Sequence, residues 1–194
     1  MDVVVDSLMP VFILVFLAEL GDKTQLTAIM LSSRASAASV FAGSMLAFFL
    51  VDGVSTLVGG TVLSFLPYRW IRLGSGLVFI ILGVLSLFRK KDKIKEEGQD
   101  VTFLKIFSVI SLMELGDKTQ LASIALAAEI GSPFIVLLGV MLAFAVVTGI
   151  GVIFGSKLLR LLPQRYLELG ASLLFVLFGV IFILEVIIDT ALIL

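Results

Sequence analysis

The segment Glu19-Leu20-Gly21-Asp22-Lys23-Thr24-Gln25-Leu26 is repeated without change as Glu114-Leu115-Gly116-Asp117-Lys118-Thr119-Gln120-Leu121. Beyond these two acidic blocks the similarity continues with a shift of one residue, so that residues 43–48 match residues 139–144 at the Gly, Met, Leu, Ala and Phe positions. A duplication of this kind predicts two copies of one structural unit.

The composition is that of a membrane protein. Of 194 residues, 60% are apolar and 15% are charged, and the mean hydropathy is +1.20. A soluble domain is about half apolar and about one quarter charged, so an ordinary water-soluble fold is excluded. The chain has no Cys and no His, which excludes disulfides, thiolate zinc sites and His-based catalysis. The net charge of -1 predicts no nucleic-acid partner.

Six apolar stretches are long enough for helices that cross a bilayer, which need about 20 residues each. They are Leu8–Leu31, Val40–Leu63, Ile71–Phe88, Phe103–Ala128, Ile135–Leu158 and Leu167–Ile188. Each copy of the repeat holds three spans, and this odd number makes the second copy enter the membrane from the opposite face. We predict an all-α integral membrane protein with six transmembrane helices in two inverted three-helix repeats (3+3). The repeats are residues 1–88 and 103–194, and a charged loop, residues 89–102, joins them.

The positions of Lys and Arg predict the orientation. Ten of them lie at one set of span ends, half of these in the loop 89–102, whereas only Arg69 and Arg72 lie at the other set. The positive-inside rule therefore places the loop in the cytoplasm and both termini outside. The first residues carry Asp2 and Asp6 but no Lys or Arg, unlike a signal peptide, so we expect the first span to stay in the mature protein.

The two acidic blocks place carboxylates deep in the membrane. Each Glu lies about 11 residues into its predicted span, or about 17 Å at a rise of about 1.5 Å per residue, which is near mid-bilayer. Glu and Asp at i and i+3 share one face of a continuous helix, so each block offers a carboxylate pair. The glycine within each block permits local unwinding, which frees backbone carbonyls as further ligands. Inverted symmetry then brings four acids toward one point: Glu19, Asp22, Glu114 and Asp117.

Ionised carboxylates at this depth cost several kcal/mol unless they are protonated, paired, hydrated or bound to a cation. Lys23 and Lys118 neutralise part of the charge. One interpretation is that these ion pairs only hold the helices together, but Ser, Thr or Asn would do so at lower cost. The duplicated block therefore favours a cation site over a packing device.

The remaining polar residues of the blocks offer further oxygen ligands. They are Thr24, Gln25, Thr119 and Gln120. A site of oxygen ligands suits Ca²⁺, Mn²⁺ and Mg²⁺, and the lack of Cys and His counts against Zn²⁺ and Cu⁺. Met45 and Met141 occupy equivalent positions in the second and fifth spans, where they either fill gaps in the core or supply a thioether that favours Mn²⁺.

Asp52 is another acid within a predicted span, about midway through the second one. Its counterpart in the other copy is Thr148. Two interpretations stay open: Asp52 assists the cation or carries protons, or it is a partner for Lys23 or Lys118.

The paired E-x-G-D-K-[ST] motif on the first and fourth of six spans resembles that of the Gdt-type cation/proton exchanger family, membrane proteins associated with Ca²⁺ and Mn²⁺ homeostasis. The resemblance covers nearly the whole chain, and neither copy departs from the motif. It implies that Glu19, Asp22, Glu114 and Asp117 form the cation site, and that bacterial-type members export Mn²⁺ from the cytoplasm. The short central loop resembles that of prokaryotic members, which implies a bacterial-type plasma membrane.

The sequence thus predicts a secondary active transporter, not an enzyme. It would export a divalent cation, Mn²⁺ first and Ca²⁺ second, in exchange for protons by alternating access. The metal is the substrate, no resident cofactor is expected, and both a monomer and a homodimer stay open. The alternatives are a passive divalent-cation channel, an exporter of small organic solutes and an intramembrane hydrolase. The lack of His and of a Ser-centred nucleophile motif counts against the hydrolase.

Overall fold

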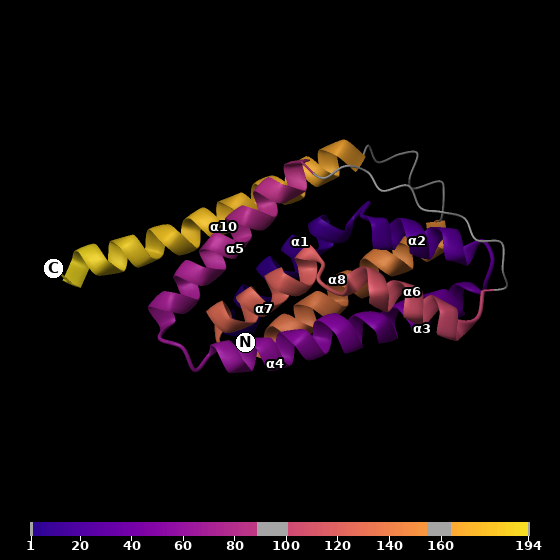
Figure 1. Ribbon diagram of the computed structural model, residues 1–194, viewed down its shortest axis with the longest axis horizontal. Coiled ribbons are helices and arrows are strands. Elements are labelled where there is room, and N and C mark those ends of the chain that lie inside the picture. The colour runs from indigo at the N-terminus through magenta and orange to yellow at the C-terminus, as the bar shows by residue number, and fades with distance from the viewer. Residues whose placement is uncertain (1, 89–100, 155–163, 194) are drawn as a thin grey trace.

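A computed structural model gives the fold, and it describes residues 2–88, 101–154 and 164–193. Every regular element in these ranges is helical (Figure 1). The elements are α1 (Asp2–Glu19), α2 (Lys23–Ser32), α3 (Ala37–Phe48), the π-helical turn η1 (Phe49–Gly53), α4 (Val54–Leu63), α5 (Tyr68–Phe88), α6 (Phe103–Glu114), α7 (Lys118–Ile130), α8 (Pro133–Phe154) and α10 (Gln164–Ile193). The predicted loop, residues 89–102, lies outside the described residues except for its last two positions, as does the end of the fifth predicted span.

Four of the described helical segments are long and apolar enough to cross a membrane. They are Ala37–Leu63, Tyr68–Leu87, Pro133–Phe154 and Leu169–Ile188, and they correspond to the second, third, fifth and sixth predicted spans. The prediction of an all-helical membrane protein is confirmed. The division into residues 1–88 and 103–194 stays a prediction, as do the six-span count and its 3+3 arrangement.

The first and fourth predicted spans are each divided into two helices at the acidic block. α1 ends at Glu19 and α2 begins at Lys23, and α6 ends at Glu114 and α7 begins at Lys118. The glycine of each block has a positive φ, 82° at Gly21 and 75° at Gly116, a conformation that only glycine adopts without strain. The predicted unwinding is confirmed. The prediction that Glu and Asp share one face of a continuous helix is wrong, because the backbone turns between them.

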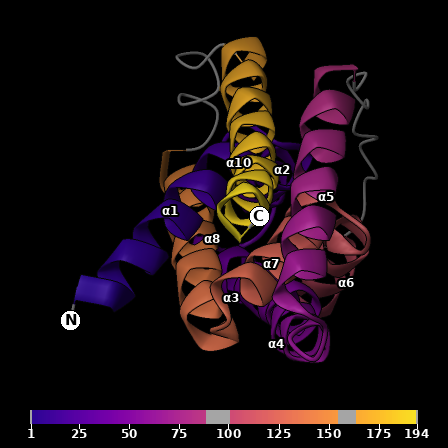
Figure 2. The same ribbon diagram turned by 90° about the vertical axis from the view of Figure 1, so that its left-hand side faces the viewer.

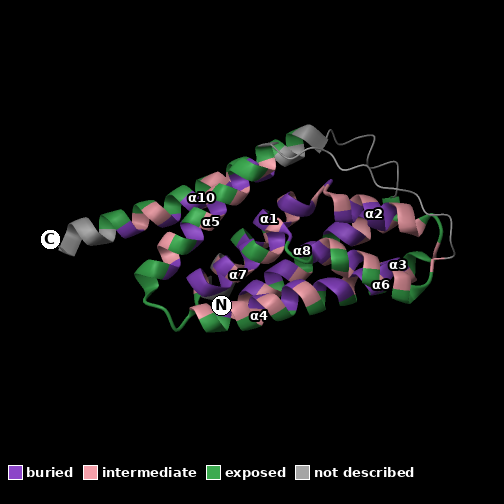
Figure 3. Cartoon of the chain, in the orientation of Figure 1, coloured by how far each residue is buried: buried purple, intermediate pink, exposed green. Residues whose placement is uncertain are grey.

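The helices pack across the sequence duplication. α1 lies on α8, α3 on α6, α4 on α7 and α5 on α10, so each of these contacts joins the first half of the chain to the second. Figure 2 shows α5 and α10 side by side. Both of these helices expose apolar side chains, whereas much of α7 and α8 is buried (Figure 3). The exposed apolar faces suit contact with lipid.

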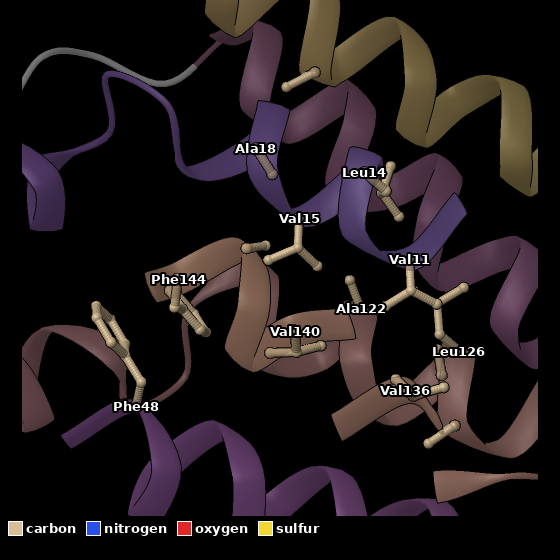
Figure 4. Close-up of a cluster of buried hydrophobic side chains, with 14 of the residues drawn as sticks. Val11, Leu14, Val15, Ala18, Phe48, Ala122, Leu126, Val136, Val140 and Phe144 are labelled. Carbon is tan, nitrogen blue, oxygen red and sulfur yellow. The ribbon is translucent and has the colours of Figure 1, made fainter. Parts of the chain in front are cut away.

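The hydrophobic core lies where α1, α3, α7 and α8 meet (Figure 4). Its labelled members are Val11, Leu14, Val15, Ala18, Phe48, Ala122, Leu126, Val136, Val140 and Phe144. This core includes the end of α1, where the first acidic block begins, and residues of α7, which starts within the second block.

Candidate cation site

Each helix break is closed by a side chain from its own block. The backbone N–H of Gly21 donates to Gln25 Oε1 at 2.6 Å, and that of Gly116 donates to Gln120 Oε1 at 2.8 Å. These N–H groups have left the helical hydrogen-bond pattern and need another acceptor. The glutamines therefore stabilise the break, which holds Glu at the end of one helix and Asp at the start of the next.

Each Glu of one block is bound by the Thr of the other. Thr24 Oγ1 donates to Glu114 Oε1 at 2.5 Å, and Thr119 Oγ1 donates to Glu19 Oε1 at 2.5 Å. All four side chains are buried. A hydrogen bond to a charged acceptor in a dry environment is shorter and stronger than one between neutral groups. The two blocks therefore meet face to face and orient each other's carboxylates.

Each Lys of one block likewise forms an ion pair with the Asp of the other block. Lys23 Nζ lies 3.2 Å from Asp117 Oδ1, and Lys118 Nζ lies 3.3 Å from Asp22 Oδ2. The Asp117 side chain is 1% exposed, and the other three are 25% exposed or less. Charges this deeply placed need partners, because an uncompensated buried charge is strongly destabilising. Each lysine partly neutralises the block of the opposite half.

Three of the four predicted metal-binding acids form one group. Carboxylate oxygens of Glu19, Asp22 and Asp117 all lie within 4.8 Å of one another, a spacing over which one cation can bridge them. Glu114 is outside this group, although it is fully buried and bound by Thr24. We call Glu19, Asp22 and Asp117 the acidic triple.

The glutamines also tie the blocks to the neighbouring helices. Gln25 Nε2 donates to the carbonyl of Val147 at 3.0 Å, and Gln120 Nε2 lies 3.4 Å from the carbonyl of Val51. Val51 and Val147 are equivalent under the one-residue shift of the duplication. Gln120 also donates to Ser55 Oγ at 2.8 Å. The two carbonyl acceptors, of Val51 and Val147, were not predicted, because a backbone carbonyl leaves no signal in a sequence.

The other predicted residues lie as follows. Met45 and Met141 are half-buried and pack against the hydrophobic core. Asp52 lies in η1 and is 0% exposed, and its counterpart Thr148 is also buried. The ion pairs of Lys23 and Lys118 described above reach Asp117 and Asp22 rather than Asp52.

A second charged cluster was not predicted at all. Arg72 Nε lies 2.8 Å from Glu129 Oε1, and Arg72 Nη2 lies 3.1 Å from Glu185 Oε2. Tyr68 donates to Glu129 Oε1 at 3.2 Å, and the Arg72 guanidinium lies over the Tyr68 ring, 4.4 Å from its centroid. This cluster joins α5, α7 and α10. Glu129 directly follows the predicted span Phe103–Ala128. An acid at that position was the sequence signal from which a charged contact at the end of the span could have been predicted.

Comparison with known proteins identifies the family. The chain matches the sequence model of the divalent cation/proton antiporter GDT1 over residues 7–94 and 102–189, and each stretch contains one acidic block. The chain belongs to this family. The expected resemblance is thereby confirmed, and the fold and site described above are those of a GDT1-family protein.

Relatives occur in plants, fungi and cyanobacteria. The GDT1-like protein 5 of Oryza sativa is 28% identical over 205 residues, which cover 84% of this chain and 88% of the relative. The divalent cation/proton antiporter GDT1 of Saccharomyces cerevisiae is 24% identical, over 87% of this chain and 80% of the relative. A GDT1-like protein of Synechocystis is 28% identical, over 87% of this chain and 92% of the relative. No solved structure matches the chain.

Proposed function

We propose that this GDT1-family protein exports Mn²⁺ from the cytoplasm in exchange for protons, and that Glu19, Asp22, Glu114 and Asp117 hold the cation. The observation that carries the proposal is the reciprocal bonding of the two blocks, in which each Thr and each Lys of one block binds an acid of the other. Two segments 95 positions apart are thereby joined into one set of oxygen ligands, of which Asp22 is half-buried and the other three acids are buried.

The charge of this set suits a divalent cation. Four carboxylates and the two lysines of the blocks leave two negative charges, which one divalent ion neutralises. Carboxylate and hydroxyl oxygens are hard ligands, and they favour Mn²⁺, Ca²⁺ or Mg²⁺ over softer metals. Ca²⁺ is the second candidate substrate.

Transport by this site requires access from both faces of the membrane. We propose six spans in two inverted repeats, in which the divided first and fourth spans meet near the bilayer midplane. Broken helices at a central site and inverted repeats are recurrent features of secondary transporters. In each cycle, deprotonated carboxylates capture the cation on the cytoplasmic side, and protons from the outside displace it after the repeats have rocked.

The membrane potential favours exchange for two or more protons. Moving a divalent cation outward against 100 mV, inside negative, costs about 4.6 kcal/mol, and the entry of two protons cancels that electrical cost. The proposed orientation has residues 89–102 in the cytoplasm and both termini outside, in a bacterial-type plasma membrane. The excess of Lys and Arg on the loop side supports this orientation.

Reconstitution in liposomes with an imposed pH gradient tests the proposal. Mn²⁺ flux should follow the proton gradient in direction and size, and Glu19→Gln or Glu114→Gln should abolish it. Glu185→Gln is the matched control, because its side chain is 44% exposed and lies outside the blocks. Full Mn²⁺ flux in both Glu variants would show that these acids do not form the transport site. Mn²⁺ flux that ignores the pH gradient would instead indicate a passive channel.

A further inference from the structure

Asp52 is a buried carboxylate without a hydrogen-bond partner from any other residue. Its side chain is 0% exposed, and neither carboxylate oxygen is satisfied. An isolated ionised carboxylate in a low-dielectric interior is very costly, and buried polar groups that lack partners in native proteins call for a specific explanation such as a bound ion. Helix packing gives no such explanation, since an apolar residue would pack there at lower cost.

A second unsatisfied oxygen lies on the neighbouring acid. Glu114 Oε1 accepts the bond from Thr24, but Glu114 Oε2 is buried and has no hydrogen-bond partner. Asp52 and Glu114 are close enough for their charges to interact, and Asp52 also interacts with Glu19 and Asp117. The η1 turn packs against α6, which ends at Glu114, and against α7 and α8. Three unsatisfied oxygens on two carboxylates therefore lie beside the acidic triple.

This arrangement exists in only one half of the protein. The counterpart of Asp52 is Thr148, which lies in the uninterrupted helix α8, whereas Asp52 lies in a π-helical turn. Short π-helical turns inside α-helices frequently mark functional sites. The duplicated blocks alone do not require Asp52, so its presence needs a reason of its own.

The charge balance of the site gives a reason for the presence of Asp52. Counted with Asp52, and with every carboxylate deprotonated as cation capture requires, the site has five carboxylates and two lysines, which leaves three negative charges. One divalent ion in the acidic triple leaves one of these uncompensated, and the unsatisfied oxygens place that charge on the Asp52–Glu114 side.

We infer that Asp52 and Glu114 form a second carboxylate position for the transported divalent cation, next to the acidic triple. This inference rests on the proposed function. The cation passes from one position to the other during transport, and the five carboxylates of the two positions provide oxygen ligands along that step. Because only the first half contributes Asp52, the two ends of the step are not equivalent.

The test separates equilibrium binding from transport in the full-length protein. Mn²⁺ binding to the purified protein is measured by calorimetry, and Mn²⁺ flux is measured in liposomes under a pH gradient. Asp52→Asn should leave Mn²⁺ affinity within about threefold of the wild type, because the acidic triple remains. The same variant should lower the maximal flux by about tenfold or more while KM for Mn²⁺ changes little.

Two further variants keep the test decisive. Asp52→Glu should recover a large part of the flux, because it restores a carboxylate, whereas Asp52→Thr, which copies the residue of the other half, should not. Wild-type flux in Asp52→Asn would overturn the inference, and so would a loss of Mn²⁺ binding as complete as that of Glu19→Gln. Failure of Asp52→Glu with a lowered melting temperature would also overturn it in favour of a packing role. If the wild type moves no Mn²⁺, the proposed function fails and this inference fails with it.

Discussion

Phe48 and Phe144 stack on each other, with their ring centroids 3.8 Å apart and their planes inclined by 9°. They are equivalent residues of the duplication, from α3 and α8. The predicted inverted repeat requires such contacts between counterparts near its two-fold axis. The hydrogen bonds between the acidic blocks are also reciprocal, because Thr24 binds Glu114 and Thr119 binds Glu19. The aromatic pair and the candidate site therefore both connect equivalent positions of the two halves.

Removing either ring should destabilise the protein to a similar extent. Both side chains are buried, and a Phe→Ala change in a core costs about 3 kcal/mol or more because a cavity is left. We expect Phe48→Ala and Phe144→Ala to lower the melting temperature in detergent by comparable amounts. Phe65→Ala, at a position that is 84% exposed, is the control and should have little effect. A large drop for only one of the two core variants would contradict the symmetric packing.

The Thr–Glu bonds should be equally important in the two halves. Thr24→Val and Thr119→Val each remove a hydroxyl that orients a buried carboxylate, and an unsatisfied buried acceptor costs about 1–3 kcal/mol. We expect each variant to lower Mn²⁺ flux by about tenfold, since the carboxylate loses its position. Thr24→Ser and Thr119→Ser keep the hydroxyl and should retain most of the flux.

Thr61 provides the control for these variants. Its hydroxyl is exposed and donates to the carbonyl of Leu57, away from the acidic blocks. Thr61→Val should leave flux unchanged. If the Val variants of the blocks transported as well as the Ser variants, the hydroxyls would have no role in holding the acids.

Glycine is required at the two helix breaks because of the backbone conformation. A Cβ at Gly116 would meet no atom within 4 Å apart from those of the adjacent residues, so the cost of Gly116→Ala comes from its φ of 75°. That cost is about 1–3 kcal/mol, and we expect a lower melting temperature and a large loss of flux. Gly74→Ala is the matched control, because Gly74 lies in α5 and its surroundings are equally open. It should be neutral or slightly stabilising, since alanine favours a helix.

Asn tolerates the left-handed conformation better than Ala does. Gly116→Asn should therefore lose less stability than Gly116→Ala in the same thermal measurement. Equal losses for the two substitutions would show that something other than φ restricts this position.

Much of the site could be predicted from sequence because the duplication is exact over the acidic blocks. It located Glu19, Asp22, Glu114 and Asp117, and the glycine within each block predicted the unwinding. What failed was the assumption of a continuous helix, because propensity alone does not tell a tolerated glycine from one with a positive φ.

Other features depend on tertiary structure and left little trace in the sequence. Glu114 lies outside the acidic triple, whereas the duplication predicts that it is equivalent to Glu19. The carbonyls that hold Gln25 and Gln120 belong to apolar residues. That the Asp52 carboxylate has no hydrogen-bond partner is evident only in the structure.

The Arg72–Glu129 pair should connect the α5–α10 pair to α7 through a measurable coupling energy. The Glu129 side chain is 7% exposed and accepts from both Arg72 and Tyr68. Removing one member takes its charged partner from the side chain of the other, so Arg72→Gln and Glu129→Gln should each destabilise the protein. Removing both should cost less than the sum of the single changes, by about 0.5–3 kcal/mol. Thermal unfolding of the two single variants and the double variant measures this coupling. Arg69→Gln, at an exposed position three residues before Arg72, is the control and should change little. Strict additivity of the two single effects would show that the pair contributes no coupling energy between α5 and α7.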